Sequence, residues 1–169
     1  MESDIKSEIV GIFTKYKHSK DIEFVEENFL DFLIANPSDK GAFRNSFKGL
    51  RKYNHFIDEV QLKFGICFSI KDRETNFSLE NFTLRVIQLM NSKRSSLKSL
   101  RNQMKQPFEL NVFLIINLIG ISIIAVLWGN KVIATVVVFL LIAINLKLAH
   151  FYHKEYSYQK RLKSRILNG

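Results

Sequence analysis

Cysteine and proline are scarce in this chain of 169 residues, which contains one Cys and two Pro. The single thiol, Cys67, excludes an internal disulfide and cannot build a zinc site alone, so the chain suits a reducing compartment. The opening residues, MESDIKSE, are acidic and polar and lack the apolar stretch of a cleavable signal peptide. We therefore expect no cleavable signal peptide.

Motifs for enzyme chemistry are also missing from the sequence. It has no phosphate-binding loop of the Walker type, no glycine-rich dinucleotide loop, no HExxH zinc motif and no nucleophile elbow. We therefore expect neither an enzyme nor a bound cofactor or metal.

Acidic residues are rare in the second half of the chain. Residues 1–90 carry 13 Lys and Arg against 14 Asp and Glu, whereas residues 91–169 carry 12 against 2. The net charge of +9 thus comes entirely from the second half. Because residues 1–90 have no basic excess, nucleic acid is not an expected partner.

What the chain does contain is a long apolar stretch, residues 110–146, whose only charge is Lys131. This stretch is too long for one membrane crossing, which needs about 20 apolar residues. Two crossings that fold back at Trp128-Gly129-Asn130-Lys131 fit it, so we predict a transmembrane hairpin. The alternative is a hydrophobic hairpin in the core of a soluble protein.

Basic residues flank this stretch on both sides, whereas the turn offers only Lys131. Positive charge favours the cytoplasmic side, so we expect both chain ends in the cytoplasm, at the inner membrane of a bacterium. The same cations would attract anionic lipid headgroups. These juxtamembrane residues are Lys93, Arg94, Lys98, Arg101, Lys105, Lys147, Lys154, Lys160, Arg161, Lys163 and Arg165.

Apolar periodicity predicts an all-α, or mostly helical, fold. Helices are expected over 2–17, about 21–35 and about 40–63, and a longer one from 79, after a cap at Ser78, to 105. A short β element near 64–77 is the one alternative, with Lys63 to Ile70 as a strand and 71–76 as a loop. The expected parts are a cytoplasmic helical domain (1–90), a basic juxtamembrane stalk helix (91–109), two transmembrane helices (110–129 and 131–149) and a basic cytoplasmic helix (150–169). The last of these continues the second transmembrane helix. Pro107 is expected in the first turn of the first transmembrane helix.

Two amides, Asn117 and Asn145, are the most conspicuous polar groups in the predicted hairpin. Counting back from the turn places Asn117 level with about Ile142, one helical turn from Asn145. An unpaired amide in hydrocarbon is costly, so we expect hydrogen bonds across helices or subunits, or a water-filled path. Ser122 and Thr135 can bond back to their own helix.

Arg51 and His55 are the weak candidates for catalysis. HEPN ribonucleases use an Arg followed, after four to six residues, by a His, but only three residues intervene here. Solvated surface residues are therefore the simpler interpretation. His150 and His153 have a spacing that can hold a metal, but we expect them in the headgroup region instead.

The layout of a helical domain followed by a two-helix hairpin resembles the small two-transmembrane effectors of bacterial anti-phage systems, including those that accompany nucleotide-signalling or CRISPR nucleases. This resemblance covers architecture only. It implies a cytoplasmic domain that senses a signal or a protein partner and hairpins that permeate or perturb the membrane.

A hairpin of two helices also leaves Asn117, Asn145 and Gly120 in need of neighbours, so we expect a homo-oligomer. One alternative function is a membrane-anchored adaptor, scaffold or immunity protein without a pore. The other is a membrane-bound HEPN-like ribonuclease that uses Arg51 and His55.

Overall fold

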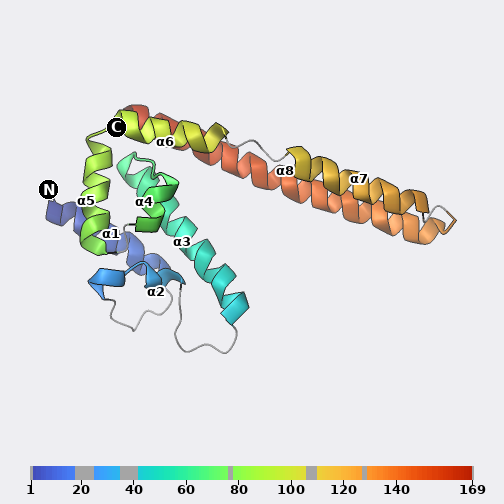
Figure 1. Ribbon diagram of the computed structural model, residues 1–169, viewed down its shortest axis with the longest axis horizontal. Helices are drawn as coiled ribbons and strands as arrows, with labels where there is room; N and C mark the ends of the chain where they lie inside the picture. Colours follow the sequence, from blue (N-terminus) through green and yellow to red (C-terminus); the bar gives the residue numbers. More distant parts are fainter. Residues whose placement is uncertain are drawn as a thin grey trace. The chain divides into compact units, whose positions relative to one another are not determined.

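The computed structural model describes residues 2–17, 25–34, 42–75, 78–105, 110–126 and 129–168, with the backbone alone at 34, 42–46, 74, 105 and 110–112. These residues form helices and no strand, so the predicted all-α class is confirmed (Figure 1). The elements are α1 (Glu2–Tyr16), a 3-10 turn (Glu26–Asn28), α2 (Asp31–Ile34), α3 (Ala42–Phe64), α4 (Ile70–Thr75), α5 (Leu79–Met90), α6 (Lys93–Lys105), α7 (Leu110–Val126) and α8 (Lys131–Asn168).

The chain divides into two compact units. Unit 1 comprises Met1–Asn102 and Arg161–Gly169, and unit 2 comprises Gln103–Lys160. In unit 1, α1 packs against α3 and α5, and α2 packs against α3. A cluster of buried rings forms its centre, with neighbouring ring centroids 5.1–6.2 Å apart. The rings are those of Phe13, Phe29, Phe56, Phe68 and Phe82.

Amphipathic periodicity explains the longer helices of unit 1. In α1, Ile5, Ile9 and Phe13 recur at every fourth position, so they share one face, and all three are buried. Helix α5 begins after Ser78, whose hydroxyl accepts a hydrogen bond from the backbone N–H of Asn81 (3.2 Å). The predictions of α1, of α3 and of the start of α5 are therefore confirmed.

The helix predicted over about 21–35 is wrong in its described part. Residues 26–28 form a 3-10 turn and 31–34 a short α-helix, with a break at Phe29 and Leu30. Residues 18–24 lie outside the described residues. Both Phe29 and Leu30 are buried although they are adjacent in sequence, and a regular helix would point them about 100° apart. Packing against the ring cluster therefore overrides the helical pattern here.

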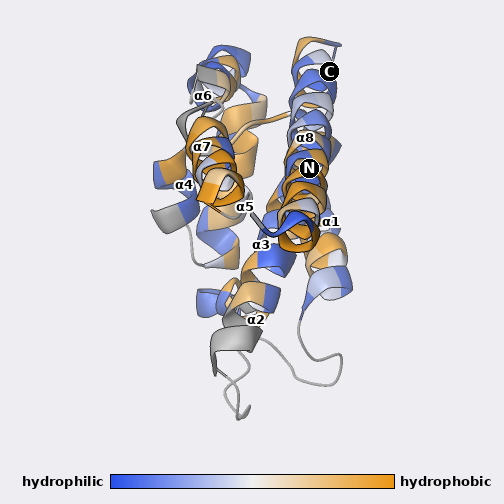
Figure 2. Ribbon diagram, turned by 90° about the vertical axis from the view of Figure 1, so that its right-hand side faces the viewer, coloured by the Kyte–Doolittle hydropathy of each residue, from blue (hydrophilic) through white to orange (hydrophobic). Residues whose placement is uncertain are grey.

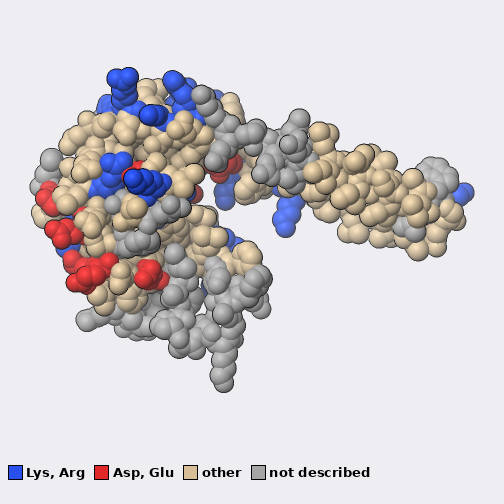
Figure 3. All heavy atoms as spheres, viewed as in Figure 1, with Lys and Arg blue, Asp and Glu red and all other residues tan. Residues whose placement is uncertain are grey.

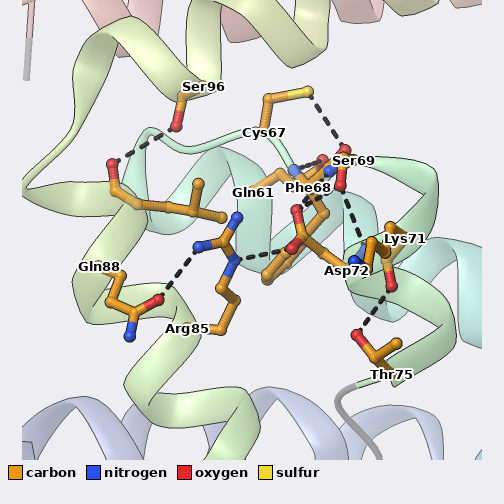
Figure 4. Close-up of polar contacts among 11 residues, drawn as sticks. Gln61, Cys67, Phe68, Ser69, Lys71, Asp72, Thr75, Arg85, Gln88 and Ser96 are labelled. Carbon is orange, nitrogen blue, oxygen red and sulfur yellow. Dashed lines mark hydrogen bonds and ion pairs between the residues drawn. The ribbon is translucent and has the colours of Figure 1, made fainter.

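The β element considered near 64–77 is not formed by the described residues, and α4 occupies 70–75, where that alternative placed a loop. Gly65 ends α3 with a φ of +63°, a conformation that favours glycine, and the N–H of Ile66 bonds to the carbonyl of Gln61 (3.1 Å). The N–H of Phe68 then bonds to the side-chain oxygen of Gln61 (2.9 Å) rather than to another strand (Figure 4).

Helix α4 is started by a reciprocal pair of hydrogen bonds between Ser69 and Asp72. The backbone N–H of Asp72 donates to the hydroxyl of Ser69 (3.2 Å), and the backbone N–H of Ser69 donates to the carboxylate of Asp72 (2.8 Å). This is a capping box, and its Ser-x-x-Asp spacing is visible in the sequence. Reading that signal would have predicted the helix.

The single helix predicted over 79–105 is also wrong, because α5 and α6 are separate. The break falls at Asn91 and Ser92, two polar residues with low helix propensity. The hydroxyl of the buried Ser96 in α6 donates a hydrogen bond to the carbonyl of Leu89 in α5 (3.5 Å) (Figure 4). This bond gives a partner to a carbonyl in the last turn of α5.

The last turns of α8 belong to unit 1 and bury two apolar side chains there. Leu162 and Ile166 are buried, and a Cβ added at Gly65 would lie 3.2 Å from the backbone oxygen of Arg165. Helix α8 is continuous from Lys131 to Asn168, which confirms that nothing stops the helix after Leu146.

In unit 2, α7 and the first half of α8 expose most of their apolar side chains, except along the faces that the two helices turn toward each other. Most of α7 and of the adjoining part of α8 is coloured as hydrophobic in Figure 2, and the same region is almost free of charge in Figure 3. Among the described helices, α8 alone is long and apolar enough to cross a membrane, and its apolar part is almost entirely exposed. Pro107 lies outside the described residues.

Candidate functional site

Two amide side chains face each other across the apolar hairpin, which we define as α7 together with Lys131–Leu146 of α8. The Nδ2 of Asn117 donates to the Oδ1 of Asn145 (3.1 Å), and the Nδ2 of Asn145 donates to the Oδ1 of Asn117 (2.9 Å). The second N–H of the Asn117 amide group donates to the carbonyl of Phe113, one turn earlier in α7 (2.8 Å). Both side chains are half-buried.

Gly120 brings the two helices together near the amide pair. It lies one turn beyond Asn117 in α7 and is buried, and a Cβ in its place would clash with the side chain of Leu141. Small residues at helix contacts in membranes allow this close approach. Gly120 therefore leaves room for the Leu141 side chain where the two helices meet, one turn from the amide pair.

The hydroxyls of the hairpin bond within their own helices. Ser122 donates to the carbonyl of Leu118 (2.9 Å), and Thr135 donates to the carbonyl of Lys131 (2.8 Å). Asn130 precedes α8, and its side-chain oxygen accepts a hydrogen bond from the backbone N–H of Ile133 (3.3 Å). These polar side chains thus find partners inside a single chain.

This pairing changes the reason for expecting an oligomer. Asn117, Asn145 and Gly120 were expected to need neighbours from other subunits, yet the hairpin supplies the neighbours itself. The expectation of a homo-oligomer stays a prediction, but these three residues no longer motivate it.

The juxtamembrane cations whose side chains are described are all exposed, and none of them forms an ion pair with another described residue. The side chain of Lys105 lies outside the described residues. Ion pairs join other cations of unit 1 to acids, namely Lys6 to Glu26, Lys15 to Glu59, Lys63 to Glu8 and Arg85 to Asp72.

Arg51 and His55 lie one turn apart on the exposed face of α3. The ring of His55 stacks on that of Tyr16 in α1, with centroids 6.3 Å apart. The hydroxyl of Tyr16 donates to the carboxylate of Glu59, which also accepts from Lys15. Burial acts to raise the pKa of Glu59, but the bonds from Lys15 and Tyr16 outweigh it, so the pKa is lowered and the carboxylate stays charged.

A shallow groove of about 510 Å³ lies between α1 and α3 beside this cluster. Its floor is apolar, from Ile12 and Leu62, and ion pairs cross it at either end. Because each of its charged groups is already paired, the groove offers no free charge to bind a small ligand. Its lining residues are Glu8, Gly11, Ile12, Lys15, Glu59, Leu62 and Lys63.

The single thiol, Cys67, lies in the segment between α3 and α4, and the carboxylate of Asp72 lies in α4 itself. Cys67 is buried, and burial raises the pKa of its thiol to about 12. Asp72 accepts from Ser69 and from the Nε of Arg85 in α5 (2.7 Å) (Figure 4). The ion pair between Asp72 and Arg85 was not predicted from the sequence, because no sequence pattern indicates that α4 and α5 come together.

The described residues contain no cluster of side chains that could hold a metal ion. No group of three or more His, Cys, Asp or Glu side chains comes together there, and His150 and His153 are both exposed on α8.

No known protein family, curated protein or solved structure matches the chain.

Proposed function

We propose that the protein is an integral membrane protein whose two-helix hairpin anchors a helical domain, unit 1, on the cytoplasmic face of a bacterial inner membrane. In this role unit 1 binds a protein partner and the hairpin keeps the complex at the membrane. The single observation that carries the proposal is the mutual pairing of Asn117 and Asn145 inside the hairpin.

The exposed apolar surface supports insertion into lipid. Leu118 and Ile121 of α7 and Val136 and Phe139 of α8 are each more than half exposed. Soluble monomers rarely expose contiguous apolar surface of this extent. In a bilayer that surface would face hydrocarbon, and two antiparallel helices would satisfy their backbone groups internally.

The amide pair favours an anchor over a pore. A permeating effector needs polar groups that face water or another subunit. These amides instead form hydrogen bonds with each other and with the Phe113 carbonyl. The permeating effector remains the competing proposal, and it requires the two amides to separate on activation.

Charge sets the proposed orientation. Basic residues flank the hairpin on both sides and the turn carries only Lys131, so both ends would face the cytoplasm. A green fluorescent protein fused to either end should fluoresce, and alkaline phosphatase fused there should be inactive. Active phosphatase at either end would overturn the orientation.

Membrane potential in cells that express the protein separates anchor from pore. We expect wild type and the Asn117→Leu/Asn145→Leu variant to leave the potential unchanged while both resist extraction at alkaline pH. Depolarisation by the wild type, lost in the variant, would establish the permeating effector instead. Extraction of the wild type at alkaline pH would overturn membrane integration itself.

A further inference from the structure

One exposed face of α8 changes from apolar to basic residues at a single point. Val136 and Leu140 are more than half exposed, and Lys147, His150 and Lys154 follow them on the same face. The spacings of 4, 7, 3 and 4 residues keep all five within one narrow stripe, because an α-helix turns once in 3.6 residues. The change falls between Leu146, the last residue of the apolar hairpin, and Lys147.

The three basic residues have no other partner among the described residues. Lys147, His150 and Lys154 are exposed, and none of them forms a hydrogen bond or ion pair with another described residue through its side chain. The one acid in α8, Glu155, lies about 100° round the helix from Lys154 and accepts a hydrogen bond from Gln159 (3.1 Å). Among the described residues, the two lysines of the stripe therefore have no acidic partner.

Aromatic side chains mark the same turns of α8. Phe151 and Tyr156 are 60% and 61% exposed, and the ring of Phe151 contacts that of Tyr152 edge to face. Exposed aromatic rings beside lysines, directly after an apolar helix, are typical of the layer where hydrocarbon meets headgroups.

We propose that Lys147, His150 and Lys154 form a binding face for the headgroups of anionic phospholipids, where α8 leaves the hydrocarbon. The inference rests on the proposed membrane insertion and adds a lipid preference to it. Lys147 and Lys154 lie about 10 Å apart along the helix axis, and a headgroup layer is about 5–8 Å thick on each side. Lysine stems bend back toward the interface, so both ammonium groups can reach the phosphates.

Charge farther along the helix provides the matched control. Lys160 and Lys163 are exposed on α8 too, but they lie about 20 Å beyond Lys147 and outside the stripe. Neutralising them removes the same charge from the same helix without touching the proposed face. The test variants are therefore Lys147→Gln/Lys154→Gln and Lys160→Gln/Lys163→Gln.

The experiment reconstitutes the full chain in phosphatidylcholine bilayers that contain a spin-labelled lipid, either phosphatidylglycerol or phosphatidylcholine. Electron paramagnetic resonance then gives the fraction of each labelled lipid that is immobilised by the protein. For the wild type we expect a severalfold preference for phosphatidylglycerol, reduced to near parity at 0.5 M NaCl because salt screens exposed charge.

The Lys147→Gln/Lys154→Gln variant should lose most of this preference, and the Lys160→Gln/Lys163→Gln variant should keep it. Parity in the wild type would overturn the proposal, and so would an equal loss in both variants, which would show a diffuse charge effect. Failure of membrane insertion is distinguishable, because neither labelled lipid would then show an immobilised component.

Discussion

Asn117 on α7 and Asn145 on α8 each donate a hydrogen bond to the other, so the two amides form a closed pair across the apolar hairpin. Such a pair specifies register, because sliding one helix by a turn would break both hydrogen bonds between the two amides. Interhelical hydrogen bonds of this kind contribute about 0.6–2 kcal/mol in membranes.

Replacing both amides should therefore weaken the hairpin by less than the two single replacements added together. We expect Asn117→Leu and Asn145→Leu each to lower the free energy of unfolding by about 0.6–2 kcal/mol. The double variant should cost less than the sum, because no orphaned amide remains. Reversible unfolding by SDS in mixed micelles, followed by the fluorescence of Trp128, the single tryptophan, measures each value.

Ser122→Ala is the control for this cycle, because the Ser122 hydroxyl bonds only to its own helix in the described structure and its loss should change little. Strictly additive effects of the two Asn substitutions would show that the pair is not formed in the micelle.

Much of the fold could be predicted from sequence periodicity, and the failures have identifiable physical causes. The spacing of Ile5, Ile9 and Phe13 predicts α1, and the uninterrupted apolar stripe predicts the length of α8. The break at Phe29 and Leu30 could not be predicted in this way, because it depends on rings brought in by α1, α3 and α5.

The candidate site was predictable to a similar degree. Counting residues back from the turn placed Asn117 within one turn of Asn145, and the two do bond. The choice between a bond within the hairpin and a bond between subunits could not be made from counting, because it depends on the close approach that Gly120 allows.

Cys67 should be inert to alkylating reagents while unit 1 is folded. Its side chain is fully buried, and burial raises the pKa of the thiol to about 12, so almost no thiolate forms at pH 8. We expect iodoacetamide to modify Cys67 at pH 8 only after unfolding, as measured by mass spectrometry. Rapid modification of the native chain would show that the segment after α3 opens locally.

The C-terminal turns of α8 should be needed for the stability of unit 1. Leu162 is fully buried, so Leu162→Ala should lower the free energy of unfolding by about 2–5 kcal/mol. Leu167→Ala is the matched control, since Leu167 is 55% exposed and should matter little. Denaturant-dependent alkylation of Cys67 in the full chain reports both values, and equal effects of the two variants would contradict the packing.

The ion pair between Asp72 and Arg85 should make the stability of unit 1 sensitive to acid. Burial acts to raise the pKa of Asp72, but hydrogen bonds from Arg85 and Ser69 outweigh it, so the pKa lies below its ordinary value of 3.8. A carboxyl whose folded pKa is lowered stabilises the fold above its unfolded pKa, and this stability is lost as pH falls through the folded pKa.

We therefore expect Asp72→Asn to lower the free energy of unfolding by about 1.5–3 kcal/mol at pH 7, the range for hydrogen bonds to a charged group. The gap between wild type and variant should persist down to about pH 5 and shrink below pH 4, as Asp72 becomes protonated. Urea unfolding monitored by far-ultraviolet circular dichroism measures it at each pH. Glu27→Gln, which neutralises an exposed carboxylate, should show no such gap, and a gap for Asp72→Asn that stayed constant down to pH 2 would contradict the lowered pKa.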